Sequence, residues 1–267
     1  MKAISTALIT GASSGIGEAL AMALAAPGVT LHLSGRNDSR LAAVAAACRT
    51  RGAGVHPRVL DVRDSIAMAA WIAAAGLLDL VVANAGISAG TGLGTPETAA
   101  QARAIFATNL DGMLNTVLPA WQAMRGQPAG ADGVRGRIAV IASIAAFVAL
   151  AAAPSYGAAK AAVDSWTVGS APAAAADGIR LTSVCPGYIR TAMTARNRFP
   201  MPGLMDADRA AAIILRGIAA GRVRLAFPWW MALAGHMAGL LPPSLLGKLV
   251  ARPPGKAPNQ SPPIEDP

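Results

Sequence analysis

The amino-acid sequence predicts an α/β fold: one doubly wound parallel sheet of about seven strands with helices on both faces. Short apolar runs alternate with longer alanine-rich stretches from the amino terminus to about residue 227, as in strand–helix–strand units with right-handed crossovers. The chain has 267 residues, of which 54% are hydrophobic and 14% charged. This composition supports one large domain with a substantial core and excludes general disorder.

Strands are expected where the apolar runs are short enough to be buried on both faces of the sheet. In chain order they are Ile4–Thr10, Val29–Ser34, Val55–Leu60, Leu78–Ala83, Arg137–Ala142, Ile179–Val184 and, as a seventh, Arg222–Phe227. Helix-like segments lie between them at about 15–26, 38–52, 64–75, 96–125, 154–176 and 206–220. We find no internal repeat or interdomain linker, so we expect a single domain over residues 1–227.

Three segments depart from this regular alternation. Gln127–Arg137 is rich in glycine, proline and charge and is predicted to be a surface loop. Pro172 lacks a backbone donor and should kink or end its helix after Ser170. The end of the chain, 252–267, contains six prolines and little apolar matter, so we expect it to be disordered.

Three glycines at the spacing Gly-x-x-x-Gly-x-Gly follow the first predicted strand directly. Gly11 supplies a sharp turn, while Gly15 and Gly17 leave room for a pyrophosphate and for helix packing. The helix that begins near Gly15 offers free N–H groups and its positive dipole end to an anion, and Ser13 and Ser14 add hydroxyl donors. The turn therefore predicts a dinucleotide site rather than an unliganded strand–helix connection.

Tyr156 and Lys160 are four residues apart in a predicted helix, and Ser143 lies thirteen residues before the tyrosine. Residues at this spacing share one helix face, so a phenol and an ammonium can act together with a nearby hydroxyl on a substrate oxygen. A nearby ammonium favours the phenolate, and we expect Lys160 to lower the pKa of Tyr156 towards the working pH. A proton donor combined with a dinucleotide site indicates hydride chemistry.

The glycine spacing occurs together with Asn84-Ala-Gly86, Ser143, Tyr156-x-x-x-Lys160 and Pro186-Gly187, in this order. Over residues 3–195 the sequence closely resembles the short-chain dehydrogenase/reductase family. The resemblance implies a single-domain Rossmann-like fold, an NAD(P)(H) cofactor and the interconversion of a carbonyl with an alcohol. Members commonly form dimers or tetramers, so it also implies a homo-oligomer.

The resemblance implies a catalytic set of Asn109, Ser143, Tyr156 and Lys160. Tyr156 would be the acid/base, Ser143 would hold the substrate oxygen, Lys160 would also bind the nicotinamide ribose, and Asn109 would support a water chain to the lysine. The implied cofactor contacts are Gly11, Ser13, Ser14, Gly15, Ile16, Gly17, Arg36, Asp61, Val62, Asn84, Ala85, Gly86, Tyr156, Lys160, Pro186, Gly187 and Thr191.

The second predicted strand ends in Ser34-Gly-Arg36-Asn37, without the acidic residue that would accept from a ribose 2′-OH. Arg36 can pair bidentately with a 2′-phosphate and stack on adenine. The pattern resembles NADP(H)-preferring members of the family, so NADP(H) is favoured and NAD(H) remains an alternative. The structural alternative for Arg36 is a surface residue without a ligand.

Other functions find little support in the sequence. The net charge of +9 is spread without a dense basic run, which argues against nucleic-acid binding. The three histidines lie in no motif that pairs them with a nucleophilic serine and an acid, and no cluster suggests a metal site. Cys48 and Cys185 are expected to be structural thiols, and the amino terminus lacks a signal segment, which predicts a cytoplasmic protein.

The carboxy-terminal part contains an apolar segment, which we assign to residues 228–251. The stretch Leu225–Gly247 carries no formal charge. Prolines at both ends of its central run leave too short a helix to cross a bilayer. It can pack on the domain, form an oligomer contact, or lie at a membrane surface with Lys248 and Arg252 among the headgroups. An apolar loop after Gly187, including Tyr188, Met193 and Phe199, predicts an apolar substrate.

The sequence is therefore interpreted as an oxidoreductase that prefers NADPH and acts on a small-molecule ketone, aldehyde or alcohol. The alternative is a regulatory or scaffold protein that binds a nucleotide in the same fold without turnover. The complete catalytic set favours the enzyme.

Overall fold

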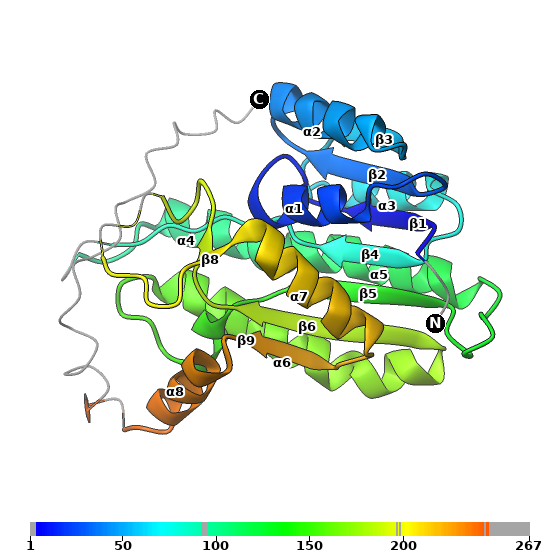
Figure 1. Ribbon diagram of the computed structural model, residues 1–267. Helices are drawn as coiled ribbons and strands as arrows, with labels where there is room; N and C mark the ends of the chain where they lie inside the picture. Colours follow the sequence, from blue (N-terminus) through cyan, green and yellow to red (C-terminus); the bar gives the residue numbers. More distant parts are fainter. Residues whose placement is uncertain (1–3, 92–94, 196, 198, 243, 246–267) are drawn as a thin grey trace.

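The computed structural model describes residues 4–91, 95–195, 197, 199–242 and 244–245. The chain order of the elements alternates strands and helices, as the sequence predicts (Figure 1). The main strands are β1 Thr6–Ile9, β2 Thr30–Gly35, β3 Gly54–Val59, β4 Leu80–Ala83, β5 Gly136–Ile141, β6 Ile179–Pro186 and β9 Arg224–Phe227. The predicted tail 252–267 lies outside the described residues.

These seven strands form one parallel sheet in the order β3-β2-β1-β4-β5-β6-β9. The chain winds outward from β1 to β3, then crosses back to β4 on the other side of β1. The strand order therefore reverses between β1 and β4, where ligands bind in doubly wound folds. A second, two-stranded parallel sheet pairs β7 Ile189–Arg190 with β8 Met205–Asp206.

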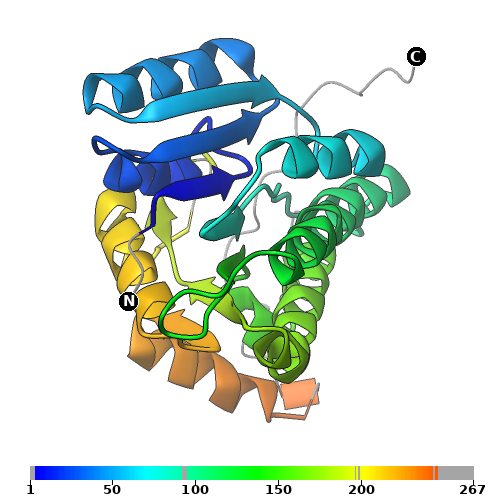
Figure 2. The same ribbon diagram turned by 90° about the vertical axis from the view of Figure 1, so that its right-hand side faces the viewer.

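Helices cover both faces of the main sheet (Figure 2). One face carries α1 Gly15–Leu24, α2 Asp38–Thr50 and α7 Ala207–Ala219, and the other carries α3 Ser65–Ala74, α4 Ala99–Phe106, α5 Gly112–Arg125 and α6 Pro154–Ala176. A π-helical turn, Ala107–Asp111, joins α4 to α5. A 3-10 helix, η2 Ile144–Phe147, follows β5, and α8 Trp229–Gly239 follows the edge strand β9.

The apolar core consists of two large clusters, one on each face of the sheet, and a small third one of Ala89, Ile105 and Ala159. Leu20, Leu41 and Ile214 anchor α1, α2 and α7 in the first cluster. Met68, Val117 and Val163 anchor α3, α5 and α6 in the second. Both free cysteines are buried, as expected for structural thiols.

The edge strands are less buried than predicted. In β3 only Val55 is buried, and in β9 only Phe227 is buried. The expectation that every strand is covered on both faces is wrong for these two, because the helices pack over the centre of the sheet more fully than over its edges. Apolar runs alone do not distinguish an edge strand from a central one.

Two further predictions need correction. Helix α6 continues through Pro172 to Ala176, so it does not end after Ser170. Burial of Ala171 and Ala174 against the sheet stabilises the last turn and offsets the backbone bond that proline removes. The segment Gln127–Arg137 is a surface loop in its middle, as predicted, but its first residue is not exposed: the buried Gln127 accepts from Leu78 N at 2.7 Å and donates to Leu78 O at 3.0 Å.

Candidate active site

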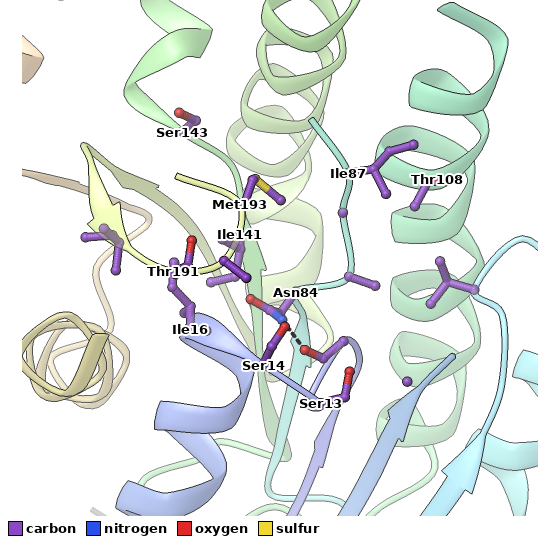
Figure 3. A pocket seen from close by; sticks show the side chains of 18 of the residues that line it. Ser13, Ser14, Ile16, Asn84, Ile87, Thr108, Ile141, Ser143, Thr191 and Met193 are labelled. Carbon is purple, nitrogen blue, oxygen red and sulfur yellow. Dashed lines mark hydrogen bonds between the residues drawn. The ribbon is translucent and has the colours of Figure 1, made fainter. Parts of the chain in front are cut away.

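A cleft of about 560 Å³ opens at the carboxyl ends of β1 and β4, where the strand order reverses. Figure 3 looks into it, with Ser13 and Ser14 at the start of α1 and Thr191 and Met193 on the loop after β7. The cleft is lined by every predicted site residue except Gly17 and Asn109. Sequence positions as far apart as Gly11 and Thr191 thus meet in one place.

The glycine-rich turn has a backbone that only glycine adopts readily. Gly11 has φ +64° and Gly15 has φ +63°. A Cβ at Gly15 would lie 2.9 Å from Thr191 Cγ2. At Gly17, which does not line the cleft, a Cβ would lie 2.5 Å from Gly11 O, so this glycine permits α1 to approach the turn.

The amino end of α1 is open towards the cleft. Ser14 occupies the N-cap position, but its side chain makes no capping hydrogen bond to the helix. Unbonded N–H groups in a first turn carry partial positive charge and bind anions. The turn therefore has both the space and the donors for a phosphate group.

Asn84 at the end of β4 fixes this turn to the neighbouring strand. Its Nδ2 donates to Thr10 O at 2.9 Å and to Gly11 O at 3.1 Å. In return Thr10 Oγ1 accepts from Asn84 N at 3.0 Å and from Ala85 N at 3.2 Å. These bonds hold the ends of β1 and β4 together at the base of the cleft.

Two arginines, Arg36 and Arg40, line the part of the cleft beyond β2. Asn37 caps α2 by accepting from Arg40 N at 2.9 Å, which fixes the start of this helix. Arg36 is half-exposed, and its Nη1 lies 4.0 Å from Asp61 Oδ2. An anion in this part of the cleft would find two guanidinium groups, one just before α2 and one in its first turn.

Asp61 follows β3 and also lines the cleft. Partial burial by itself would raise the pKa of its carboxyl. Hydrogen bonds from the Arg63 side chain and backbone, with the charges of Arg63 and Arg36, outweigh this effect and lower the pKa. The carboxylate is therefore ionised at neutral pH and engaged mainly by Arg63, 2.8 Å away.

Ser143 after β5 and Tyr156 on α6 are joined by a side-chain hydrogen bond. The prediction that Lys160 lowers the pKa of Tyr156 is wrong for this structure. Loss of hydration on burial raises the pKa of Tyr156, the Ser143 hydrogen bond offsets part of the rise, and the nearby phenol of Tyr188 adds to it. The Lys160 ammonium lies 5.9 Å from the tyrosine ring centroid and donates elsewhere.

Lys160 is buried, and its Nζ donates to Ile141 O at 2.6 Å. Burial penalises the charged ammonium and lowers its pKa from 10.5 to about 8, with a small opposing effect from Cys185. A lysine with this pKa can both hold and release a proton near neutral pH.

Asn109 sits in the π-helical turn between α4 and α5 and is buried. Its Oδ1 accepts from Ile87 N at 2.8 Å, and its Nδ2 donates to Ile87 O at 2.9 Å. A Cβ on Gly86 would lie 3.2 Å from Asn109 Oδ1 and 3.6 Å from Lys160 Nζ, so the asparagine and the lysine flank this glycine. Asn109 thus holds the segment after β4 that lines the cleft. π-Turns of this kind occur frequently at functional sites.

The structure adds lining residues that the sequence did not single out, and it also places Met193 of the predicted apolar loop in the lining. The added residues are Gly35, Asn37, Arg40, Leu60, Ile87, Thr108, Ile141, Ala142, Ile189, Ala192 and Thr194. Arg40 could have been found as a second basic residue close after Arg36, in the first turn of the helix predicted over 38–52. Thr194 could have been found as a turn partner of Thr191, whose N donates to Thr194 Oγ1 at 3.0 Å.

The histidines take no part in this cleft. His32 and His56 stack on each other with ring centroids 5.1 Å apart, and His236 packs on Phe147 at 3.9 Å. Within the described ranges, no group of three or more histidine, cysteine, aspartate or glutamate residues could hold a metal ion.

Known proteins share both the sequence and the fold of this chain. Residues 5–200 match the family model described as short chain dehydrogenase. An uncharacterized oxidoreductase of Myxococcus xanthus is 35% identical over 254 residues, which cover 92% of this chain and 96% of the relative. The ketoacyl reductase HetN of Nostoc sp. is 33% identical over 205 residues, covering 74% of this chain and 69% of that protein. A solved short-chain dehydrogenase from Sphingobium yanoikuyae in complex with NADPH has a TM-score of 0.76 and 27% identity, covering 89% of this chain and 95% of that one.

Proposed function

The chain belongs to the short-chain dehydrogenase family of oxidoreductases, and from this premise we propose that it uses NADP(H) to interconvert a carbonyl and an alcohol on an apolar substrate. The observation that carries the proposal is the meeting of Ser143, Tyr156 and Lys160 in the cleft that the glycine-rich turn also lines. Proton-transfer groups and a phosphate-binding turn within one cleft suit hydride transfer.

The residues present fit a dinucleotide. The glycine turn leaves the space that a Cβ would fill, and the uncapped amino end of α1 offers its N–H groups to the pyrophosphate. Asp61 and Val62 would border the adenine, Asn84 to Gly86 would line the middle of the cofactor, and Pro186, Gly187 and Thr191 would meet its nicotinamide half. A relative of the same family is solved in complex with NADPH, which supports the cofactor class.

Preference for NADPH is proposed on the charge beyond β2. Arg36 and Arg40 both line the cleft there, and together they would neutralise a 2′-phosphate. The nearby acid, Asp61, is held by Arg63 and follows a different strand, so it does not occupy the position from which an acid accepts from a ribose 2′-OH.

When bound, the nicotinamide supplies or accepts the hydride at the substrate carbon. Tyr156 would give its proton to the carbonyl oxygen in reduction and take the alcohol proton in oxidation. Ser143, already hydrogen-bonded to the phenol, would hold the same oxygen and stabilise its developing negative charge. The raised pKa of Tyr156 keeps the phenol protonated and ready to donate in the reductive direction, whereas oxidation requires the phenolate as the base.

Lys160 would bind the nicotinamide ribose and replace the proton that the tyrosine gives up. Its pKa of about 8 suits both tasks near neutral pH. Asn109 would position the segment at Ile87 and support water between the lysine and solvent.

An apolar substrate is proposed from the side chains around the reacting groups. Ile87 and Met193 line the cleft, and Tyr188 packs edge-on against Phe199 with ring centroids 6.0 Å apart. The ketoacyl reductase among the relatives supports a carbonyl on an acyl chain as one substrate of this kind. By family analogy we also propose a homo-oligomer, since Phe106 on α4 and Leu118 on α5 are exposed.

Replacement of Tyr156 by phenylalanine tests the proposal. We expect NADPH-dependent reduction of an apolar ketone to fall at least about a hundredfold, because general acid catalysis contributes that much. NADPH affinity should stay within a few-fold of the wild type. Retained NADPH affinity is the internal control, because it shows that the variant is folded and that its cofactor site is intact. Unchanged turnover in the Tyr156 variant would instead favour a nucleotide-binding scaffold.

A further inference from the structure

Helix α8 presents its large side chains outward and its small ones inward. Ala232 and Gly235 are its buried residues. Trp229, Leu233 and Met237 follow one another at a four-residue spacing, on one face of the helix, and are 74%, 54% and 58% exposed. Leu240 continues this face, and Trp230 lies at its border. We call this set the α8 face: Trp229, Trp230, Leu233, Met237 and Leu240. A helix that served only the core would have the opposite arrangement.

The inner side of α8 is shaped for close packing on the domain. Gly235 lies against Ile144 and Phe147 of η2, where a Cβ would come within 3.3 Å of Phe147. His236 packs on the Phe147 ring with centroids 3.9 Å apart. The helix is therefore fixed to the protein, and the exposure of its outer face is not the result of a detached segment. Figure 1 shows α8, in orange, beyond the edge strand β9.

The α8 face adjoins the candidate active site. Helix η2, on which α8 packs, follows Ser143 directly. The start of α8 lies against Gly187, which lines the cleft. A Cβ on Gly187 would lie 2.9 Å from Met231 Sδ and 3.1 Å from Pro228 Cδ. Trp230 packs on the loop at Gly203, where a Cβ would lie 2.9 Å from the indole. The exposed apolar surface thus continues into the segments proposed to surround the substrate.

The sequence on either side of α8 carries charge of one sign, although one of its cations, Arg224 on β9, is paired with Asp164 at 2.7 Å. From residue 209 to residue 264 the sequence carries seven arginines and lysines and no aspartate or glutamate. Three of these cations, Lys248, Arg252 and Lys256, come within seventeen residues after the end of α8. Within α8 itself there is no arginine, lysine, aspartate or glutamate. Tryptophans beside aliphatic side chains, with basic residues near them in the chain, are typical of segments that bind anionic lipid.

We propose that the α8 face docks on an anionic lipid surface and brings the mouth of the cleft to the bilayer, from which an apolar carbonyl substrate reaches Tyr156. The docking surface stands on the exposure and charge given above, whereas the substrate route rests on the proposed function. The helix lies in the plane of the interface. Among the described residues, no helix is both long enough and apolar enough to cross a bilayer. A second copy of the chain is the competing occupant, which the experiment distinguishes.

The test is flotation of the full-length protein with vesicles of phosphatidylcholine alone and of a roughly 2:1 mixture with phosphatidylglycerol. The test variant is Leu233→Glu/Met237→Glu. Its matched control is Ile66→Glu/Leu77→Glu, which also replaces two exposed apolar side chains by glutamate. Ile66 and Leu77 are 82% and 63% exposed and lie in and just after α3, away from α8. Light scattering follows the oligomeric state of each protein, and circular dichroism confirms that each is folded.

We expect the wild type and the control to float with the anionic vesicles, and the α8 variant to lose at least about tenfold in partitioning. Binding should be weaker to the neutral vesicles and should fall with added salt. Absence of wild-type binding, equal binding of the α8 variant, or equal binding to neutral and anionic vesicles would each overturn the proposal. Dissociation of an oligomer by the α8 variant, without wild-type flotation, would assign the face to a second copy instead.

The proposed route of the substrate from the bilayer is tested separately, by measuring ketone reduction with the same variants. Reduction of a long-chain ketone dissolved in the vesicles should slow in the α8 variant, while reduction of a short water-soluble ketone should not. Equal rates on the vesicle-borne ketone would overturn the route. If neither ketone is reduced by the wild type, the proposed function fails, and the flotation result stands independently of it.

Discussion

Replacing Lys160 by methionine should remove a pH dependence from the stability of the protein without bound nucleotide. In the folded protein the Lys160 ammonium is buried, and its pKa is lowered from 10.5 to about 8. Between these two values the unfolded chain binds a proton that the folded protein does not. The free energy of unfolding must therefore rise with pH in this window, and the contribution is absent when no amine is present.

The magnitude follows from the two pKa values. Their difference corresponds to about 3 kcal/mol of stability. Of this, about 1 kcal/mol falls between pH 7 and pH 9, because the folded lysine has a pKa of about 8. At pH 7 the buried ammonium costs the wild type most of the total, and its hydrogen bond to Ile141 O returns part of that cost.

Urea denaturation at pH 7, 8 and 9, followed by circular dichroism, measures the effect. Between pH 7 and pH 9 the free energy of unfolding of the wild type should rise by about 1 kcal/mol relative to that of the variant. Lys160→Gln is a second variant, which can still donate to Ile141 O but does not titrate, so its curve should run parallel to that of Lys160→Met. Parallel curves for the wild type and both variants over this range would refute the buried, pKa-shifted lysine.

Two other substitutions test the cofactor half of the cleft. Arg36→Gln should weaken NADPH binding about tenfold and leave NADH binding unchanged, since a half-exposed arginine–phosphate pair contributes about 1–2 kcal/mol. Calorimetric titration measures both affinities, with Arg58→Gln on the exposed edge strand β3 as the control. Equal losses of affinity for the two nucleotides would contradict this role of Arg36. Gly17→Ala should cost about 1–3 kcal/mol of stability, because its Cβ would lie 2.5 Å from Gly11 O. Gly169→Ala is the control, because nothing lies within 4 Å of its new Cβ, and its stability in urea denaturation should instead rise by about 0.5–1 kcal/mol. A gain of stability in the Gly17 variant would show that the turn is not tightly packed.

Much of the fold could be predicted because parallel strands are continuous apolar runs. The run around Leu31 and the run around Val81 were each placed within two residues, and the order of elements followed from their alternation with helices. Exposure of β3 could not be predicted, since nothing in its composition says that it lies at an edge. Continuation of α6 through Pro172 depends on burial of Ala171 and Ala174, which is a tertiary effect.

The candidate site also has features that the sequence predicts and features that only the structure shows. Gly11, Tyr156 and Lys160 could be found from spacing, because backbone geometry and helix periodicity are local properties. The direction of the pKa of Tyr156 could not, because it depends on how much water the fold removes and on where the Lys160 ammonium donates its hydrogen bond. Likewise the sequence shows that the α8 segment is apolar, but only the structure shows that Leu233 faces outward.

Calorimetric titration of the wild-type protein with NADPH and, separately, with NADH tests the central claim most directly. We expect one nucleotide per chain to bind, with NADPH at least about tenfold tighter than NADH, because Arg36 and Arg40 would meet the additional phosphate. Tighter binding of NADH would contradict the assignment of these arginines and leave the oxidoreductase in place. Binding of neither nucleotide would contradict the assignment of the cleft as a dinucleotide site.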